Sequence, residues 1–270
     1  MFNRSYPSNK TLKGVEMAKN DTVPISLWDI PLALVLLTRL PVPKLPSQVF
    51  ARQASAAWAF PFVGAILGAL ACCVGWAAMS IGLNATASAI LVVTALILST
   101  GAMHEDGLAD TVDGFWGGFT PERRLEIMKD SHIGTYGVLA LILSLFLRVT
   151  LIETLIAAQY FSAILAASVW SRAMMPPVMA SLPNARGSGL SQSVGAPKIS
   201  IVAGGVGLAF GICAVLIGIS ALAAVLLSAL AVLALAMVAR SKIGGQTGDV
   251  LGAAQQISEI AMLLTLVTLL

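Results

Sequence analysis

Seven stretches of the sequence are almost wholly apolar, and each reaches the roughly 20 residues that a helix needs to cross a bilayer. They cover residues 58–81, 85–103, 136–157, 160–182, 199–219, 221–239 and 250–270. Of the 270 residues, 57% are hydrophobic and 11% are charged, whereas a soluble domain carries about 25% charged residues. The sequence therefore predicts an all-α, polytopic integral membrane protein, built as a bundle of about seven transmembrane helices.

The residues before the first span fall into two parts. Residues 1–24 are polar and basic, so we expect a disordered cytoplasmic tail. Residues 25–40 are moderately apolar, but they are few and are interrupted by Asp29 and Pro31. This pattern favours an N-terminal interfacial or re-entrant helix over a span. Residues 25–270 are expected to form a single membrane-embedded domain.

The segment between the second and third spans holds more than half of the thirteen acidic residues. If the chain is helical from His104 onward, Asp106, Asp110 and Asp113 project from one face. Like charges at that spacing repel each other, so a cation is expected beside them. Carboxylate oxygens without a nearby cysteine favour a hard divalent cation, Mg²⁺ or Mn²⁺, over zinc. Mg²⁺ usually completes its shell with substrate phosphates, so the pattern indicates metal-held diphosphate chemistry.

The alternative for this acidic segment is a solvated loop. Apolar side chains are interleaved with the acids, however, among them Leu108, Val112 and Phe115. A merely solvated face would be more polar throughout, so the site interpretation is favoured.

A second polar turn, residues 240–249, separates the last two spans. Its glycines, including Gly245, leave room for close backbone approach, and the N–H groups that follow Thr247 at a helix start favour anions. Asp249 would add a fourth carboxylate to the same cation if this turn faces the acidic segment. Ordinary turns use the same residue types, so this pattern alone has little specificity.

Basic residues near these two segments are candidate phosphate ligands. Arg123 and Lys129 belong to the densest basic cluster in the body of the chain, Arg186 lies in a polar loop, and Arg39 precedes Pro41. Contact with lipid headgroups is the alternative role for such side chains.

Several charged or amide side chains lie inside the apolar stretches themselves, where each is unfavourable unless it is paired or faces a polar interior. They are Arg148, Glu153, Arg172, Gln255, Gln256 and Glu259. The last three lie about one turn apart and predict a polar interior face on the final helix.

The distribution of loop charge predicts the orientation. With the N-terminus inside, residues 104–131, 183–198 and 240–249 fall on one side and carry nearly all loop lysine and arginine. The turns on the opposite side carry none, which places both candidate site segments in the cytoplasm. The net charge of +3 is too small to indicate nucleic-acid binding.

Four motifs, in order, resemble cobalamin synthase, the adenosylcobinamide-GDP ribazoletransferase family. They are LLTRLPVP at 36–43, HEDGLADTVDG at 104–114, LEIMKDSHIGTYG at 125–137 and GGQTGDVLGA at 244–253. The resemblance runs from about residue 26 to the end of the chain. His132 stands where the family often has arginine.

The resemblance implies a transferase of the last assembly step of the cobalamin nucleotide loop. In that step α-ribazole, or its 5′-phosphate, joins adenosylcobinamide-GDP and GMP leaves. Mg²⁺ is the expected cofactor, with Mn²⁺ as an alternative. We accordingly expect residues 25–270 to be a catalytic domain in a bacterial inner membrane, multi-pass, with its active site facing the cytoplasm and no nucleic-acid partner. The number of copies that assemble is left open.

The candidate residues are expected to have the following roles. Mg²⁺ is held by Asp106, Asp110 and Asp249, with Glu105 as a further candidate. Asp113 is the first choice for the general base that takes a proton from the ribazole hydroxyl, and His104 is the second. The candidate substrate-binding residues are Arg39, Arg123, Lys129, Arg186, Gly245 and Thr247.

Two other classes of protein remain as alternatives. A cation-coupled secondary transporter also uses acids within the membrane and broken helices. Against it, the sequence has no clear internal repeat, and its acids cluster near one interface. A purely structural membrane subunit would leave both acidic segments without a role.

Overall fold

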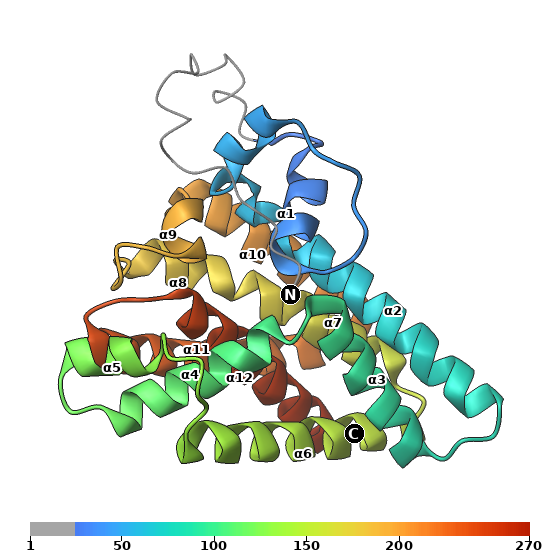
Figure 1. Ribbon diagram of the computed structural model, residues 1–270. Helices are drawn as coiled ribbons and strands as arrows, with labels where there is room; N and C mark the ends of the chain where they lie inside the picture. The colour runs from blue at the N-terminus through green and yellow to red at the C-terminus, as the bar shows by residue number, and fades with distance from the viewer. Residues whose placement is uncertain (1–24) are drawn as a thin grey trace.

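The computed structural model describes residues 25–270, and the expected disordered tail, residues 1–24, lies outside this range. Within it the regular elements are helices (Figure 1). They are α1 (Asp29–Leu37), the short 3₁₀ helices η3 (Ser47–Arg52) and η4 (Ser55–Ala59), α2 (Phe60–Ser80), α3 (Ala85–Thr100), α4 (Met103–Gly117), α5 (Pro121–Ile127), α6 (Thr135–Ala157), α7 (Phe161–Ala173), α8 (Met175–Ser181), α9 (Leu190–Val194), α10 (Ile199–Ile217), α11 (Ser220–Ile243) and α12 (Gly248–Thr268). The all-α prediction is confirmed.

The predicted count of seven spans is not confirmed. In the described part of the chain, five helices are long and apolar enough to cross a bilayer: α2 with the turn before it, α6, α10, α11 and α12. A sixth span results if α3 and α4 are counted together, although their axes differ by 87°. The chain is therefore an integral membrane protein with five or six candidate spans.

The bend between α3 and α4 has a local backbone cause. Gly101 and Ala102 both adopt left-handed conformations, with φ of 68° and 60°. Glycine does so readily, whereas alanine does so at a cost of roughly 1–2 kcal/mol. The acidic segment thus begins a new helix in a new direction instead of extending α3.

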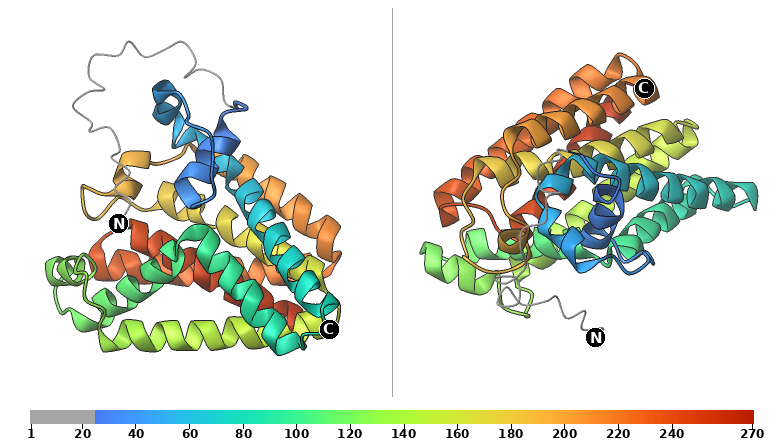
Figure 2. Two further views of the ribbon diagram at one scale, coloured as in Figure 1. Left: turned by 45° about the vertical axis from the view of Figure 1, so that its right-hand side comes forward. Right: turned by 90° about the horizontal axis from the view of Figure 1, so that it is seen from above.

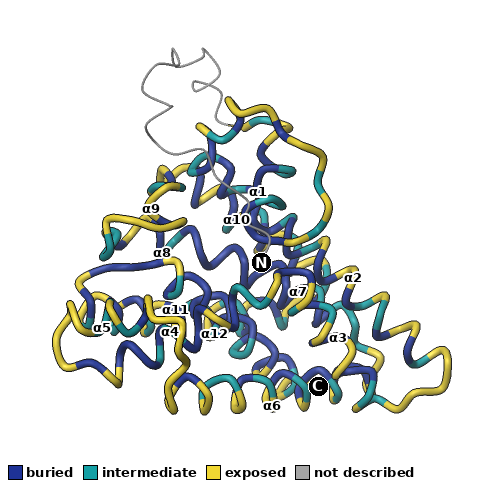
Figure 3. The backbone as a smooth tube through the Cα atoms, viewed as in Figure 1, coloured by how far each residue is buried: buried dark blue, intermediate teal, exposed yellow. Residues whose placement is uncertain are grey.

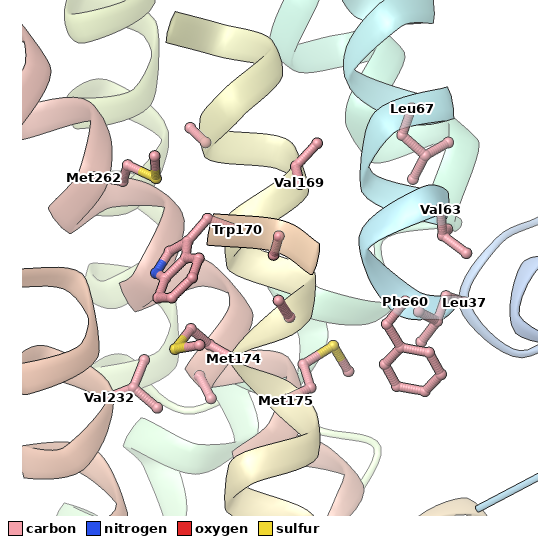
Figure 4. Close-up of a cluster of buried hydrophobic side chains, with 14 of the residues drawn as sticks. Leu37, Phe60, Val63, Leu67, Val169, Trp170, Met174, Met175, Val232 and Met262 are labelled. Carbon is pink, nitrogen blue, oxygen red and sulfur yellow. The ribbon is translucent and has the colours of Figure 1, made fainter. Parts of the chain in front are cut away.

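The predicted span at residues 160–182 divides into two short helices. α7 has 13 residues, too few to cross the bilayer alone, and α8 follows after a break at Met174. Pro176 and Pro177 at the start of α8 cannot donate backbone hydrogen bonds to the preceding turn. The apolar composition of this stretch reflects burial in the protein core (Figure 4).

The short helix expected near residues 25–40 is present as α1, and a buried ion pair fixes it to the turns before α2. Asp29 accepts hydrogen bonds from Nε of Arg52 at 3.0 Å and from Nε1 of Trp58 at 2.9 Å. Burial alone would raise the pKa of the Asp29 carboxyl, but the bonds from Arg52, Trp58 and Ser26 outweigh it and hold the pKa below its ordinary value.

α12 is the central helix of the bundle. Of its most apolar stretch, 72% is buried inside the protein, against 28% for α10 and for α11. It packs against α4, α6, α7 and α11, and its backbone is mostly dark in the burial view (Figure 3). In the left-hand view of Figure 2, α6 runs along the lower edge of the bundle, below α12.

A buried polar network connects α12 to its neighbours. Arg148 of α6 donates to Glu105 of α4 at 2.7 Å and to Glu259 of α12 at 3.0 Å. Arg172 of α7 lies 3.5 Å from the other oxygen of Glu259. Gln256 of α12 donates to Glu105 at 3.1 Å. The expected polar interior face of the last helix is confirmed, and its charges are paired.

We expect Arg148→Met to lower the free energy of unfolding in detergent by about 3–5 kcal/mol, because it leaves the buried Glu105 without its cation and Glu259 with Arg172 alone. The matched control is Arg123→Met, which removes an exposed ion pair with Glu126 (2.9 Å) and should change stability by less than about 1 kcal/mol. Equal losses in the two variants, measured by denaturant unfolding, would contradict the assigned importance of the network.

Candidate active site

The acidic helix α4 and the start of α12 approach each other through two glycines. A Cβ atom on Gly107 would lie 2.8 Å from the backbone oxygen of Asp249, and one on Gly252 would lie 3.2 Å from Cα of His104. Side chains at these positions would push the helices apart, whereas small residues let them pack closely. The contact brings the two acidic segments together, although they are far apart in sequence.

A cavity of about 210 Å³ lies beside this contact. Its lining has two chemically different parts. The polar wall is defined as His104 and Asp106 from α4, Asp249 from α12, Arg186 from the loop after α8, and Ser191 from α9. The apolar wall is defined as Leu36 and Leu37 from α1, Phe60 from α2, and Met175 and Met179 from α8, and further apolar lining comes from Met103, Leu190, Val194 and Leu251. The pairing of acidic helix and second turn that the sequence predicts is therefore present at one cavity.

The loop after α8 brings Arg186 to the polar wall. The backbone N–H of Gln246 donates to the carbonyl of Pro183 at 2.8 Å, and the N–H of Ala185 donates back to the carbonyl of Gln246 at 2.9 Å. Gly245 packs directly against Pro183, with no room for a side chain. Nη2 of Arg186 consequently forms a 2.7 Å ion pair with Asp249, with both side chains less than 20% exposed.

Thr247 caps the helix that carries Asp249. Its hydroxyl oxygen accepts the N–H of Val250 at 3.3 Å and donates to Asp249 at 3.2 Å. These contacts orient the carboxylate. Direct substrate contact by Gly245 and Thr247 stays a prediction.

Asp110 lies one helical turn beyond Asp106 and is partly buried. It is within electrostatic range of Asp106, Asp249 and Arg186. Three carboxylates and one guanidinium thus gather at the contact between α4 and α12.

Asp113 has backbone partners that the sequence did not reveal. Its two carboxylate oxygens accept the N–H groups of Gly134 at 2.7 Å and Gly137 at 2.8 Å. These bonds anchor the start of α6 to α4. The contacts favour a positioning role for Asp113, and its role as general base stays an untested prediction.

His104 and Glu105 are neighbours in sequence but face different surroundings. His104 lines the cavity and is buried, and its Nε2 has no hydrogen-bond partner among the described residues. Glu105 is not among the cavity residues, and it bonds to Arg148 and Gln256 in the core. Of the two side chains, His104 is the one placed for contact with a ligand.

Arg39 lies beside the main cavity. It lines a second cavity of about 120 Å³ that shares Leu36, Leu37 and Met103 with the first. Its side chain packs over Gly101 at the bend, where a Cβ would approach it to 2.8 Å. Arg39 is therefore within reach of a ligand that extends out of the main cavity.

The other two basic candidates are on the surface near α5. Arg123 and Lys129 are exposed, and neither lines the main cavity. Nearby, Nδ1 of His132 lies 2.8 Å from a carboxylate oxygen of Asp130. This hydrogen bond and the negative charge of Asp130 raise the pKa of the His132 imidazole. These side chains form a surface outside the cavity, and a substrate role for Arg123 and Lys129 stays a prediction.

The carboxylates of the polar wall suit Mg²⁺. No set of three or more His, Cys, Asp or Glu side chains in residues 25–270 is arranged to hold a metal by itself. Mg²⁺, however, is usually bound through one or two carboxylates plus substrate phosphates and water. Asp106 and Asp249, facing one cavity, supply that number of protein ligands.

Comparisons with known proteins show to which family the chain belongs. A family model described as cobalamin-5-phosphate synthase matches residues 29–267. An adenosylcobinamide-GDP ribazoletransferase of Mesorhizobium japonicum is 41% identical over 240 residues, covering 88% of this chain and 92% of the relative. Proteins of the same name from Bradyrhizobium diazoefficiens and Brucella anthropi are 41% and 42% identical, covering 90% and 87% of this chain and 95% and 94% of the relatives. No solved structure matches the chain significantly.

The glycine contact gives a direct test of the site's assembly. We expect Gly107→Val to lower the free energy of unfolding by roughly 1–3 kcal/mol, because the new side chain collides with the backbone of α12. The matched control is Gly204→Val on α10, where a Cβ meets nothing within 4 Å. A thermal melt in detergent that shows the same shift for both variants would contradict close packing at Gly107.

Proposed function

This chain belongs to the cobalamin-5-phosphate synthase family and acts as an adenosylcobinamide-GDP ribazoletransferase, and we propose that its chemistry takes place on the polar wall of the cavity. A hydroxyl of α-ribazole, or of its 5′-phosphate, attacks the phosphorus that is esterified to cobinamide. The new P–O bond forms, the bond to the bridging oxygen of the diphosphate breaks, and GMP leaves.

Asp106 and Asp249 are the proposed metal ligands, and Asp110, which is not among the cavity residues, is a third candidate one turn along α4. Mg²⁺ bound there would neutralise negative charge on the diphosphate and help to position it. Glu105 is omitted from this set, since its bonds to Arg148 and Gln256 hold it in the core.

Arg186 is the proposed phosphate-binding residue. Its Nε is buried and has no hydrogen-bond partner within the described part of the chain, so this donor is available to a phosphate oxygen. A guanidinium presents several donors in one plane, which matches the geometry of a phosphate group. The ion pair with Asp249 holds this donor set beside the proposed metal ligands.

His104 is the proposed general base. It lines the cavity, and its Nε2 has no protein partner in residues 25–270. The neutral imidazole accepts a proton at one ring nitrogen, and the proton to be removed is that of the attacking hydroxyl. Asp113 is less well placed, since both of its oxygens already accept backbone N–H groups.

The single observation that carries this proposal is the convergence of Asp106, Asp249 and Arg186 on one cavity from three separate segments. Diphosphate transfer depends on charge neutralisation and in-line positioning, and this set can provide both. The basic residues of the adjoining loops favour a cytoplasmic active site in a bacterial inner membrane. Membership of this transferase family favours the enzyme over the alternative of a cation-coupled secondary transporter.

We expect Asp106→Asn and Asp249→Asn each to reduce GMP release from adenosylcobinamide-GDP by about 100-fold or more, because each removes a carboxylate that would hold Mg²⁺ beside the diphosphate. The control is Glu153→Gln, which alters an acid bonded to Thr86 at a different place in the bundle and should keep activity within about twofold. Undiminished GMP release by the Asn variants at saturating Mg²⁺ would exclude these residues from the site.

A further inference from the structure

The apolar wall has no role in the phosphate chemistry described above. Its five side chains are buried, with exposures of 5% or less for Leu36, Leu37, Phe60, Met175 and Met179. Leu37 and Phe60 lie side by side, and Met175 points toward Phe60 (Figure 4). Apolar residues that line a cavity beside a few polar groups are the usual surroundings of a ligand's apolar part.

The two substrates carry four ring systems apart from their sugars: corrin, guanine, the adenine of the adenosyl group, and the base of the acceptor. The corrin ring is a macrocycle with many amide side chains, too large for a cavity of about 210 Å³ and too polar for its apolar wall. Guanine and adenine carry hydrogen-bonding groups around their edges, which leucine, phenylalanine and methionine side chains cannot satisfy, and burying such groups unpaired is unfavourable. None of these three rings matches the apolar wall.

The aromatic base of the acceptor does match it. A benzimidazole joined to ribose has no N–H donor on its ring, keeps a single acceptor nitrogen, and is otherwise hydrocarbon along its edge. We propose that the apolar wall is the subsite for this base, an inference that rests on the function proposed above. The base lies between Phe60 and Met175, and the attached ribose faces His104 and Asp106 on the polar wall.

The residue types of the wall fit a flat ring with variable substituents. Phe60 provides an aromatic surface for offset or edge contact with the base. Methionine is unbranched and polarisable, fills irregular gaps, and makes favourable sulfur contacts with aromatic rings. Met175 and Met179 therefore determine which bases the enzyme accepts. The polar wall recognises the ribose, which all such acceptors share.

The test compares two adjacent methionines in the purified full-length enzyme. Met175 lines the cavity, while Met174 is 5% exposed and is not among the cavity residues. Replacement of either by alanine removes a buried side chain, so the loss of stability is similar in kind. We expect Met175→Ala to raise the KM for α-ribazole about tenfold or more and to leave the KM for adenosylcobinamide-GDP within about twofold. Met174→Ala should leave both KM values nearly unchanged.

Free benzimidazole provides a second measurement that needs no variant. On the wild-type enzyme it should inhibit competitively against α-ribazole and noncompetitively against adenosylcobinamide-GDP. The same shift in both methionine variants, a rise confined to the KM for adenosylcobinamide-GDP, or inhibition that α-ribazole does not relieve would overturn the proposed subsite. An absence of GMP release by the wild-type enzyme would instead contradict the proposed function itself.

Discussion

The contact between α4 and α12 is the interaction on which the rest of the structure depends. Gly107 and Gly252 allow the two backbones to approach closely, and Arg148 holds the same helices through Glu105 and Glu259. Buried charges are destabilising unless they are paired with good geometry, so this network fixes the two helices relative to each other. Asp106 and Asp249 lie on these two helices, so the same packing fixes their relative positions. Both side chains line the cavity.

The packing of the bundle brings apolar and polar residues to the same cavity. Helices α1, α2 and α8 are apolar elements of the bundle, and they supply the hydrocarbon side of the cavity. The bend at Gly101 and Ala102 and the docked loop at Asn184 bring polar groups to the other side. In the proposed site, an anionic diphosphate therefore lies next to an apolar ring.

The sequence predicted those features that depend on local pattern. Apolar length predicted the helical bundle, acidic spacing predicted a helix that carries Asp106, Asp110 and Asp113, and the glycine-rich turn pointed to Asp249. It did not predict the division of residues 160–182, because burial in protein and burial in lipid require the same composition. Nor did it predict the partners of Glu105 and Asp113. The partners of Glu105 lie 43 and 151 residues away in the chain, and those of Asp113 lie 21 and 24 residues away. Such long-range bonds leave no periodic signal.

The most direct test of the central claim is a structure of the enzyme with Mg²⁺ and a nonreactive analogue of adenosylcobinamide-GDP. The measured quantities are the distances from the metal to the carboxylate oxygens of α4 and α12. We expect oxygens of Asp106 and Asp249 at about 2.0–2.1 Å from one Mg²⁺ that also contacts the diphosphate. A metal bound through one helix alone, or a diphosphate bound outside the cavity, would contradict the account.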